Sequence, residues 1–368
     1  MSDPGREAVH VWNALHFPDR AEGHTTTSAY TLLVERDGHG AVRSTRRVPP
    51  PSPAPWEARG LRAGPDFRNR VRDLGKRVPG LQSVTASLRV LSRDPEEAGT
   101  PHVTGHVLSR VETPAGPVLA GTPWDTDPPV TDTIPSREGR RDTPRGWRDL
   151  PLLLDPPVAA VLVSAVRLAL LSRGGRRTRE RYSGRRLFPR VDLTDLPLAH
   201  PEGGVDDAGA SALTLPLIRA GALTGLGEGS TTGRAVWDHG AARLGGGPAR
   251  LDLTGSPTPA GRAPDTPVVP GTPEPTDAVR LTWCLEHLQR YQSDGTVHLT
   301  CAAVLGHAPE RWFTLGLRAR PIALMRRVEA PVGFARRVFS DDEVSTPGLL
   351  LPPASRLNHT KGIRVEQI

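Results

Sequence analysis

The segment Val158–Ser172, VAAVLVSAVRLALLS, is the feature that most limits how this chain can fold. It follows Asp155, Pro156 and Pro157, and an acidic cap with an early proline favours the start of a helix. Apolar residues lie almost all the way round such a helix, so we expect it to be buried on every side. The chain has no apolar run of about 18 residues or more, so no membrane span is expected. The remaining residues therefore have to cover this helix.

The composition indicates that the cover consists of strands and turns. Of the 368 residues, 39 are proline and 38 are glycine, whereas aromatic residues make up only 4%. Such high proline and glycine usage favours many turns and extended segments. The length allows two domains. The N-terminus is charged and no apolar segment follows it, which predicts no signal peptide and a cytoplasmic location.

The first half of the chain is predicted to hold an extension and a small domain. Residues 1–56 are predicted to be an N-terminal extension and linker, in which Arg43–Pro55 is too rich in proline and arginine for regular structure. Residues 57–121 are predicted to be an N-terminal α/β domain. Its helix is indicated by apolar residues spaced three or four apart behind the candidate cap Asp66, namely Phe67, Val71, Leu74 and Val78. A strand at 83–91 and a hairpin about residues 114–116 follow.

The second half is predicted to be larger and richer in strands. Residues 122–150 are polar and proline-rich, so we interpret them as an interdomain linker. Residues 151–368 are predicted to form a C-terminal β-rich domain, with a hairpin that turns at Arg219-Ala220-Gly221. The predicted fold class is therefore α+β: a small N-terminal α/β domain, then a mainly antiparallel, barrel-like β domain that carries one buried helix.

Two turns flank that hairpin and carry a resemblance. Val205-Asp206-Asp207-Ala208-Gly209 is an acidic turn before it, and Gly229–Ala235, GSTTGRA, lies after it. This order resembles the C-terminal half of the TldD/PmbA family of heterodimeric zinc metallopeptidases, although position 208 is alanine where the family usually has glutamate. The resemblance extends over about residues 60–365. It implies that peptide or partner contacts are made by Asp206, Asp207, Gly209, Thr232 and Gly233.

The same resemblance bears on zinc. In metallopeptidase members of the family, the buried helix carries two histidines that hold zinc and a glutamate that activates water. Matching the helix end places Val163 and Leu168 at the histidine positions and Ser164 at the glutamate. Valine and leucine have no lone pair, and a serine hydroxyl is too weak a base. The resemblance therefore implies a TldE/PmbA-like subunit without catalytic residues or a bound cofactor, with zinc in a TldD-like partner subunit. A plain core helix unrelated to the family is the alternative.

Under this interpretation, the chain positions an extended, leader-type peptide for proteolysis by the partner in a metallopeptidase heterodimer. The alternative is a stand-alone interaction or nucleic-acid-binding protein that uses the basic run Arg173–Arg186. Tyr182 is the only aromatic residue in this run, so nucleic acid is not the expected partner. An enzyme with a different active site is a third option, although no G-x-S-x-G motif occurs. Cys284 and Cys301 are expected to be buried, inert thiols.

Overall fold

A computed structural model gives the fold. It describes residues 6–18, 24–36, 42–52, 54, 57, 62–77, 81–93, 102–113, 116–123, 142–171, 182–188, 190–197, 213–224, 235–238, 243–246, 249–255, 275–285, 295–306, 311–339 and 342–368.

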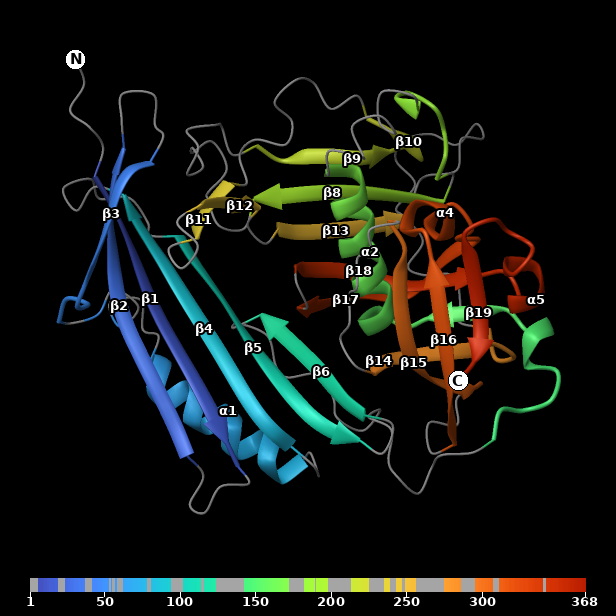
Figure 1. Cartoon of the computed structure of the whole chain (residues 1–368), viewed down its shortest axis with the longest axis horizontal. Helices are drawn as coiled ribbons and strands as arrows, with labels where there is room; N and C mark the ends of the chain where they lie inside the picture. Colours follow the sequence, from blue (N-terminus) through green and yellow to red (C-terminus); the bar gives the residue numbers. More distant parts are fainter. Residues whose placement is uncertain are drawn as a thin grey trace.

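The N-terminal region is one antiparallel sheet with a helix on one face (Figure 1). The strand order is β3-β2-β1-β4-β5-β6. The bounds are β1 Arg6–Phe17, β2 His24–Arg36, β3 Val42–Val48, α1 Ala63–Arg77, β4 Leu81–Arg93, β5 His102–Thr113 and β6 Gly116–Pro123. Phe67 of α1 packs edge-on against Trp12 of β1, with 5.7 Å between the ring centroids. Phe67, Val71 and Leu74 are all buried, as their spacing predicted.

This sheet extends further towards the N-terminus than we expected. β1 pairs with both β2 and β4, so strands that precede residue 57 belong to the same sheet as those that follow it. β3 occupies residues 42–48, where the proline- and arginine-rich composition had predicted no regular structure. The edge of β2 supplies its hydrogen bonds, and Arg47 lies 4.1 Å from the centre of the Tyr30 ring. The boundaries at residues 56, 121 and 150 stay predictions.

The C-terminal region follows a short 3-10 helix, η4 Trp147–Asp149. Its elements are β7 Leu152–Leu154, α2 Pro156–Leu171, β8 Val191–Pro197, β9 Leu215–Arg219, β10 Ala222–Leu223, β11 Ala235–Asp238, β12 Arg243–Gly246, β13 Ala249–Gly255, β14 Val279–Leu285, β15 Val297–Leu305, β16 Trp312–Ala319, α4 Pro321–Met325, β17 Ala330–Phe339, β18 Glu343–Leu351, α5 Ala354–Leu357 and β19 Ile363–Gln367.

Strands β11 and β12 form a two-stranded sheet of their own, and the other strands of this region curl around α2. On one edge β18 pairs with β17; on the other, its first half pairs with β13 and its second half with β7. The sheet then runs to β8 and β9 on one side, and through β14, β15 and β16 to β19 on the other. Among the described strand pairs, only β13–β18 and β7–β14 are parallel. Among the described residues β19 pairs only with β16, so the barrel-like sheet stays open, and the α+β class is confirmed.

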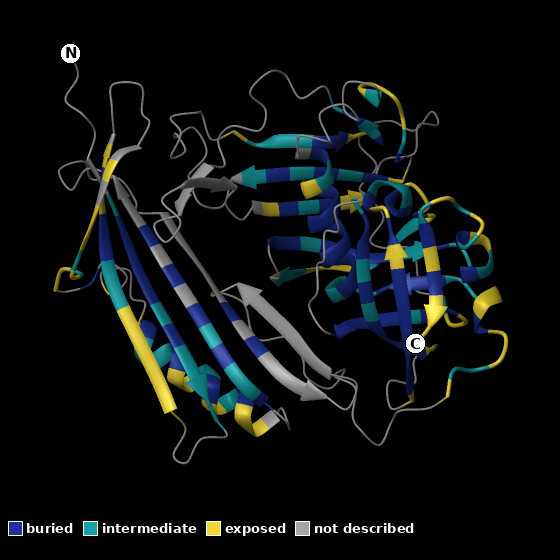
Figure 2. Cartoon of the chain, in the orientation of Figure 1, coloured by how far each residue is buried: buried dark blue, intermediate teal, exposed yellow. Residues whose placement is uncertain are grey.

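Helix α2 is the centre of this region, as Figure 2 shows by its dark blue burial colour. Every residue from Val158 to Arg167 is buried, and leucines on the flanking strands complete the core. The carbonyl of Asp155 accepts hydrogen bonds from the first turn, and its carboxylate accepts one from Arg280 at 2.9 Å. The predicted buried helix is confirmed, and it begins at Pro156.

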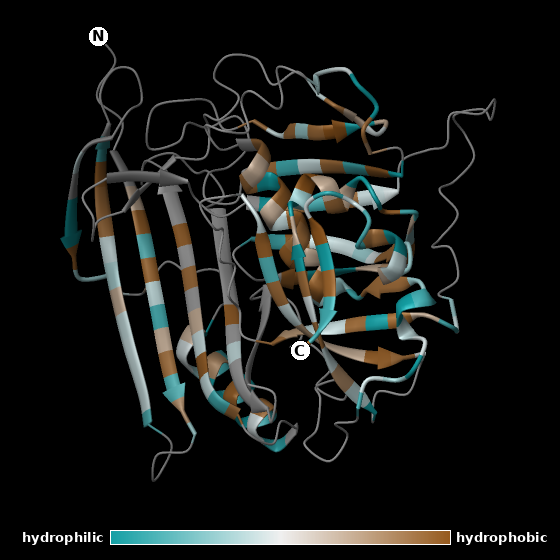
Figure 3. Cartoon of the chain, turned by 45° about the vertical axis from the view of Figure 1, so that its right-hand side comes forward, coloured by the Kyte–Doolittle hydropathy of each residue, from teal (hydrophilic) through white to brown (hydrophobic). Residues whose placement is uncertain are grey.

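The two regions are joined through β6. Its Val118 pairs with Leu285 of β14, and its Gly121 pairs with Phe339 of β17, so strands of both regions belong to one continuous sheet. Figure 3 shows hydrophobic and hydrophilic residues alternating along many of these strands, the pattern of a sheet with one buried face. No described helix is long and apolar enough to cross a membrane.

Candidate functional site

The three helix positions that the resemblance assigns to zinc chemistry do not form a metal site. Val163 and Ser164 are fully buried in α2, whereas Leu168 is 39% exposed. Residues five apart on a helix point roughly 140° away from each other, which explains why one of these positions lies in the core and the other at the surface. Valine and leucine offer no ligand atom, so these residues do not fit a zinc ion. In the described part of the chain, no three histidine, cysteine, aspartate or glutamate residues lie together as metal ligands would.

Ser164 nevertheless differs from its apolar neighbours. Its hydroxyl oxygen is fully buried and has no hydrogen-bond partner among the described residues. A buried hydroxyl without a partner costs free energy, because it has lost its hydrogen bonds to water. The position that the resemblance matches to a glutamate thus holds a polar atom that the surrounding core does not satisfy.

A buried ionic cluster anchors the last turns of α2. Arg167 donates from Nε to Asp195 of β8 at 2.9 Å and from Nη1 to Asp342, just before β18, at 3.2 Å. All three side chains are at least nine-tenths buried. A buried charge needs such partners, since its desolvation is otherwise too costly. The sequence analysis missed this cluster, although a single arginine within an apolar helix was a signal that a buried acid faces it.

A second ionic cluster lies on the opposite face of the same sheet. Neighbouring strand residues point to opposite faces, so Glu343 faces away from the helix that Asp342 meets. One oxygen of Glu343 accepts hydrogen bonds from Arg250 at 2.7 Å and Arg337 at 2.6 Å. Burial raises the pKa of the nearby Asp252 carboxyl; Arg250 opposes this shift, Glu343 adds to it and Arg337 opposes it. Salt bridges between arginines and carboxylates suit positioning and binding more than proton transfer.

The other predicted site residues lie outside the described part of the chain. These are Asp206, Asp207 and Gly209 of the acidic turn and Thr232 and Gly233 of the later turn. The hairpin between them is present: β9 and β10 pair in register, and the turn residues Ala220 and Gly221 have φ angles of 49° and 73°. The amide of Gly221 donates to Asp192 of β8 at 3.1 Å, which fixes the hairpin to the sheet.

The basic run Arg173–Arg186 is described only over residues 182–186. There Arg185 lies 5.9 Å from the centre of the Tyr182 ring, so the one aromatic residue of the run is already in contact with a cation. Arg186 forms a bridge with Ala222 of β10. This end of the run is therefore tied to the β9–β10 hairpin.

Comparison with solved structures identifies proteins of the same fold. TldE from Thermococcus kodakarensis matches with a TM-score of 0.59 and 12% identity, over 98% of this chain and 97% of its own. A proposed modulator of a DNA gyrase from Thermotoga maritima matches with a TM-score of 0.53 and 12% identity, over 98% of this chain and 96% of its own. A proposed modulator of DNA gyrase from Bacteroides thetaiotaomicron matches with a TM-score of 0.53 and 10% identity, over 100% of this chain and 95% of its own. No protein-family model matches, and no curated protein is significantly similar in sequence. This chain thus has, over nearly its whole length, the fold of TldE.

Proposed function

We propose that this chain is the zinc-free, TldE/PmbA-like subunit of a heterodimeric metallopeptidase, with a TldD-like partner that carries the zinc. The observation that carries the proposal is the structure of α2 in a chain with the fold of TldE. The helix forms the centre of the core, yet Val163, Ser164 and Leu168 supply no group able to hold a metal ion. A chain of this kind contributes to proteolysis by binding rather than by chemistry.

The role we assign to it is to hold a leader-type peptide in extended form for cleavage by the partner. An extended peptide can add to a sheet as a further strand, because an unpaired edge presents backbone donors and acceptors. Such edges occur at several of the described strands. Among these strands, β3 pairs only with β2, and β19 pairs only with β16. Strand β6 pairs along its length with β5 but at a single residue each with β14 and β17. These edges support the binding role, and the proposal places the complex in the cytoplasm.

Co-expression with a TldD-like protein tests the proposal. We expect the two chains to elute as one complex in size-exclusion chromatography, with zinc bound by the partner and peptidase activity on an unstructured peptide above that of either chain alone. A partner variant whose zinc-binding histidines are replaced by alanine serves as the control, and it should form the complex without activity. Separate elution together with unchanged peptidase activity would rule out the proposed role.

The nucleic-acid alternative makes a different prediction. If the run Arg173–Arg186 binds nucleic acid, labelled nucleic acid should bind more weakly as the salt concentration rises. Replacing the arginines by alanine should abolish this binding. No feature of residues 182–186 favours that outcome over the peptide role.

A further inference from the structure

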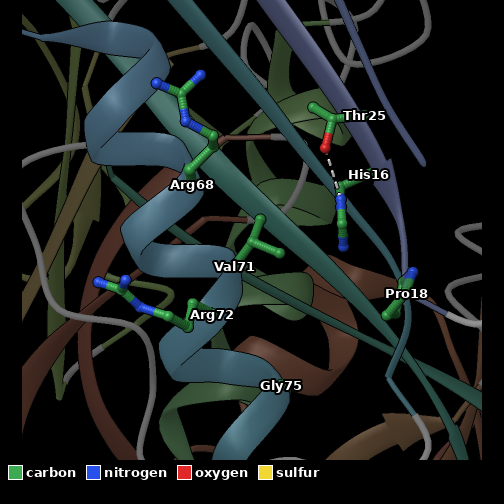
Figure 4. A pocket seen from close by; sticks show the side chains of 7 residues that line it. All are labelled: His16, Pro18, Thr25, Arg68, Val71, Arg72 and Gly75. Carbon is green, nitrogen blue, oxygen red and sulfur yellow. Dashed lines mark hydrogen bonds between the residues drawn. The ribbon is translucent and has the colours of Figure 1, made fainter. Parts of the chain in front are cut away.

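A groove lies between α1, the end of β1 and the start of β2 (Figure 4). No acidic residue lines it. Its volume is about 420 Å³, which is within the size range of ligand sites. Figure 4 shows His16, Thr25 and Pro18 on one side and the residues of α1 on the other. The lining consists of His16, Pro18, Thr25, Arg68, Val71, Arg72 and Gly75.

The helix side of the groove carries positive charge that no described acid neutralises. Arg68 and Arg72 lie one helical turn apart, where two like charges destabilise a helix. Arg72 donates to the neutral oxygen of Asn69 at 2.8 Å, and Arg68 makes no hydrogen bond or ion pair with another described residue. Helix α1 as a whole has five basic residues and two acidic ones. The groove is therefore suited to a negatively charged ligand.

The remaining lining is apolar or able to form hydrogen bonds. Val71 and Pro18 contribute apolar surface, and a Cβ added to Gly75 would meet no atom within 4 Å, so the helix leaves open space there. The Thr25 hydroxyl and Nδ1 of His16 are 2.7 Å apart, which leaves Nε2 as the ring nitrogen available to a ligand. Burial is the larger cause that lowers the pKa of His16, and the charge of the nearby His24 is the smaller one. The ring is therefore neutral at pH 7. A small inorganic anion would leave this apolar volume unfilled.

We propose that the groove binds an acidic segment of the peptide substrate, with apolar side chains against Val71 and carboxylates near Arg68 and Arg72. The inference rests on the proposed function and adds to it the class of peptide. Arginine is the residue best suited to carboxylates, because its guanidinium can donate two parallel hydrogen bonds. Clusters of arginine are a recurrent means of recognising acidic peptide motifs.

Direct binding to the purified full chain tests this inference without the partner. Fluorescence anisotropy would compare a short labelled peptide that alternates glutamate with leucine and the same peptide with glutamine for glutamate. We expect the acidic peptide to bind at least tenfold more tightly, and Arg68→Gln with Arg72→Gln to remove this difference. Lys76→Gln is the matched control, since Lys76 is an exposed cation of the same helix outside the groove. Circular dichroism would verify that each variant is folded.

A second variant tests the groove itself rather than its charge. Gly75→Leu fills the open space while keeping both arginines, and we expect it to weaken the acidic peptide about tenfold; Gly75→Ala should leave binding unchanged. Equal affinity for the two peptides, or no loss in the arginine variants, would overturn the inference. A single-stranded oligonucleotide that binds more tightly than the peptide through the same arginines would also overturn it. Complex formation and peptidase gain with the partner are measured separately, so either proposal can fail alone.

Discussion

Replacing Ser164 by alanine should stabilise the protein. The Ser164 hydroxyl is fully buried in α2, and no described residue forms a hydrogen bond with it. A buried hydroxyl without a partner costs roughly 1–3 kcal/mol. Alanine also favours the helix interior by up to about 0.5 kcal/mol relative to serine. Against these gains stand the dispersion contacts of one oxygen atom, each worth about 0.1–0.2 kcal/mol. We expect a net gain of about 1–2 kcal/mol in the free energy of unfolding.

Urea unfolding measures this gain as a higher midpoint with an unchanged slope. Thr282→Val is the matched control, because the Thr282 hydroxyl is also buried but donates to the carbonyl of Ala302 at 3.2 Å. Its loss should lower stability by about 1 kcal/mol. Thr314→Val should behave like Ser164→Ala, since the Thr314 hydroxyl is buried without a partner as well. A Ser164→Ala protein that is less stable than the parent would refute the reasoning, because the hydroxyl would then have a favourable partner.

Three further outcomes follow from buried polar groups. Arg167→Met should lower the free energy of unfolding by about 3–5 kcal/mol, measured by urea unfolding, because it leaves two buried carboxylates without their cation. The Cys284 and Cys301 thiols should react with a thiol reagent only after denaturation, because contact with Cys284 and burial raise the pKa of Cys301. Burial lowers the pKa of His10 in the folded protein below its unfolded value of 6.5. The neutral His10 ring therefore contributes fully to stability above pH 6.5, and this contribution is lost as the pH falls towards the pKa of the folded state. His10→Gln should therefore make the decline in stability between about pH 7 and pH 5 less steep. Thermal unfolding at several pH values measures this decline.

The sequence predicted elements whose pattern is local. The spacing of Phe67, Val71 and Leu74 marked α1 because a helix repeats every 3.6 residues, and these side chains are buried. The hairpin at Gly221 was predictable because a turn of this kind needs residues that tolerate positive φ. The Cys284 and Cys301 thiols are buried as expected, and they face each other across β14 and β15.

What the sequence did not show depends on contacts between distant residues. β3 is a strand because β2 offers it an edge, and an exposed edge strand with Arg46 and Arg47 has no apolar alternation to mark it. The pairing of Arg167 with Asp342 spans 175 residues, and the groove brings the end of β1 and the start of β2 against α1. The fold class was therefore within reach of the sequence, whereas the partners of individual charges were not.

The apolar residues of α2 fill the core of the curled sheet, and Val163 and Leu168 offer no ligand atom for a metal ion. A helix that holds a catalytic metal ion on one side needs an opening there for substrate and water, whereas α2 is buried from Val158 to Arg167 within the curled sheet. Arg167 then fixes the next turn through two buried carboxylates, which leaves Leu168 facing outwards. Single histidines at positions 163 and 168 would consequently meet different surroundings, one dry and one exposed. Under the proposed function, this helix is the structural centre of a binding subunit, and catalysis in the assembly comes from the partner chain.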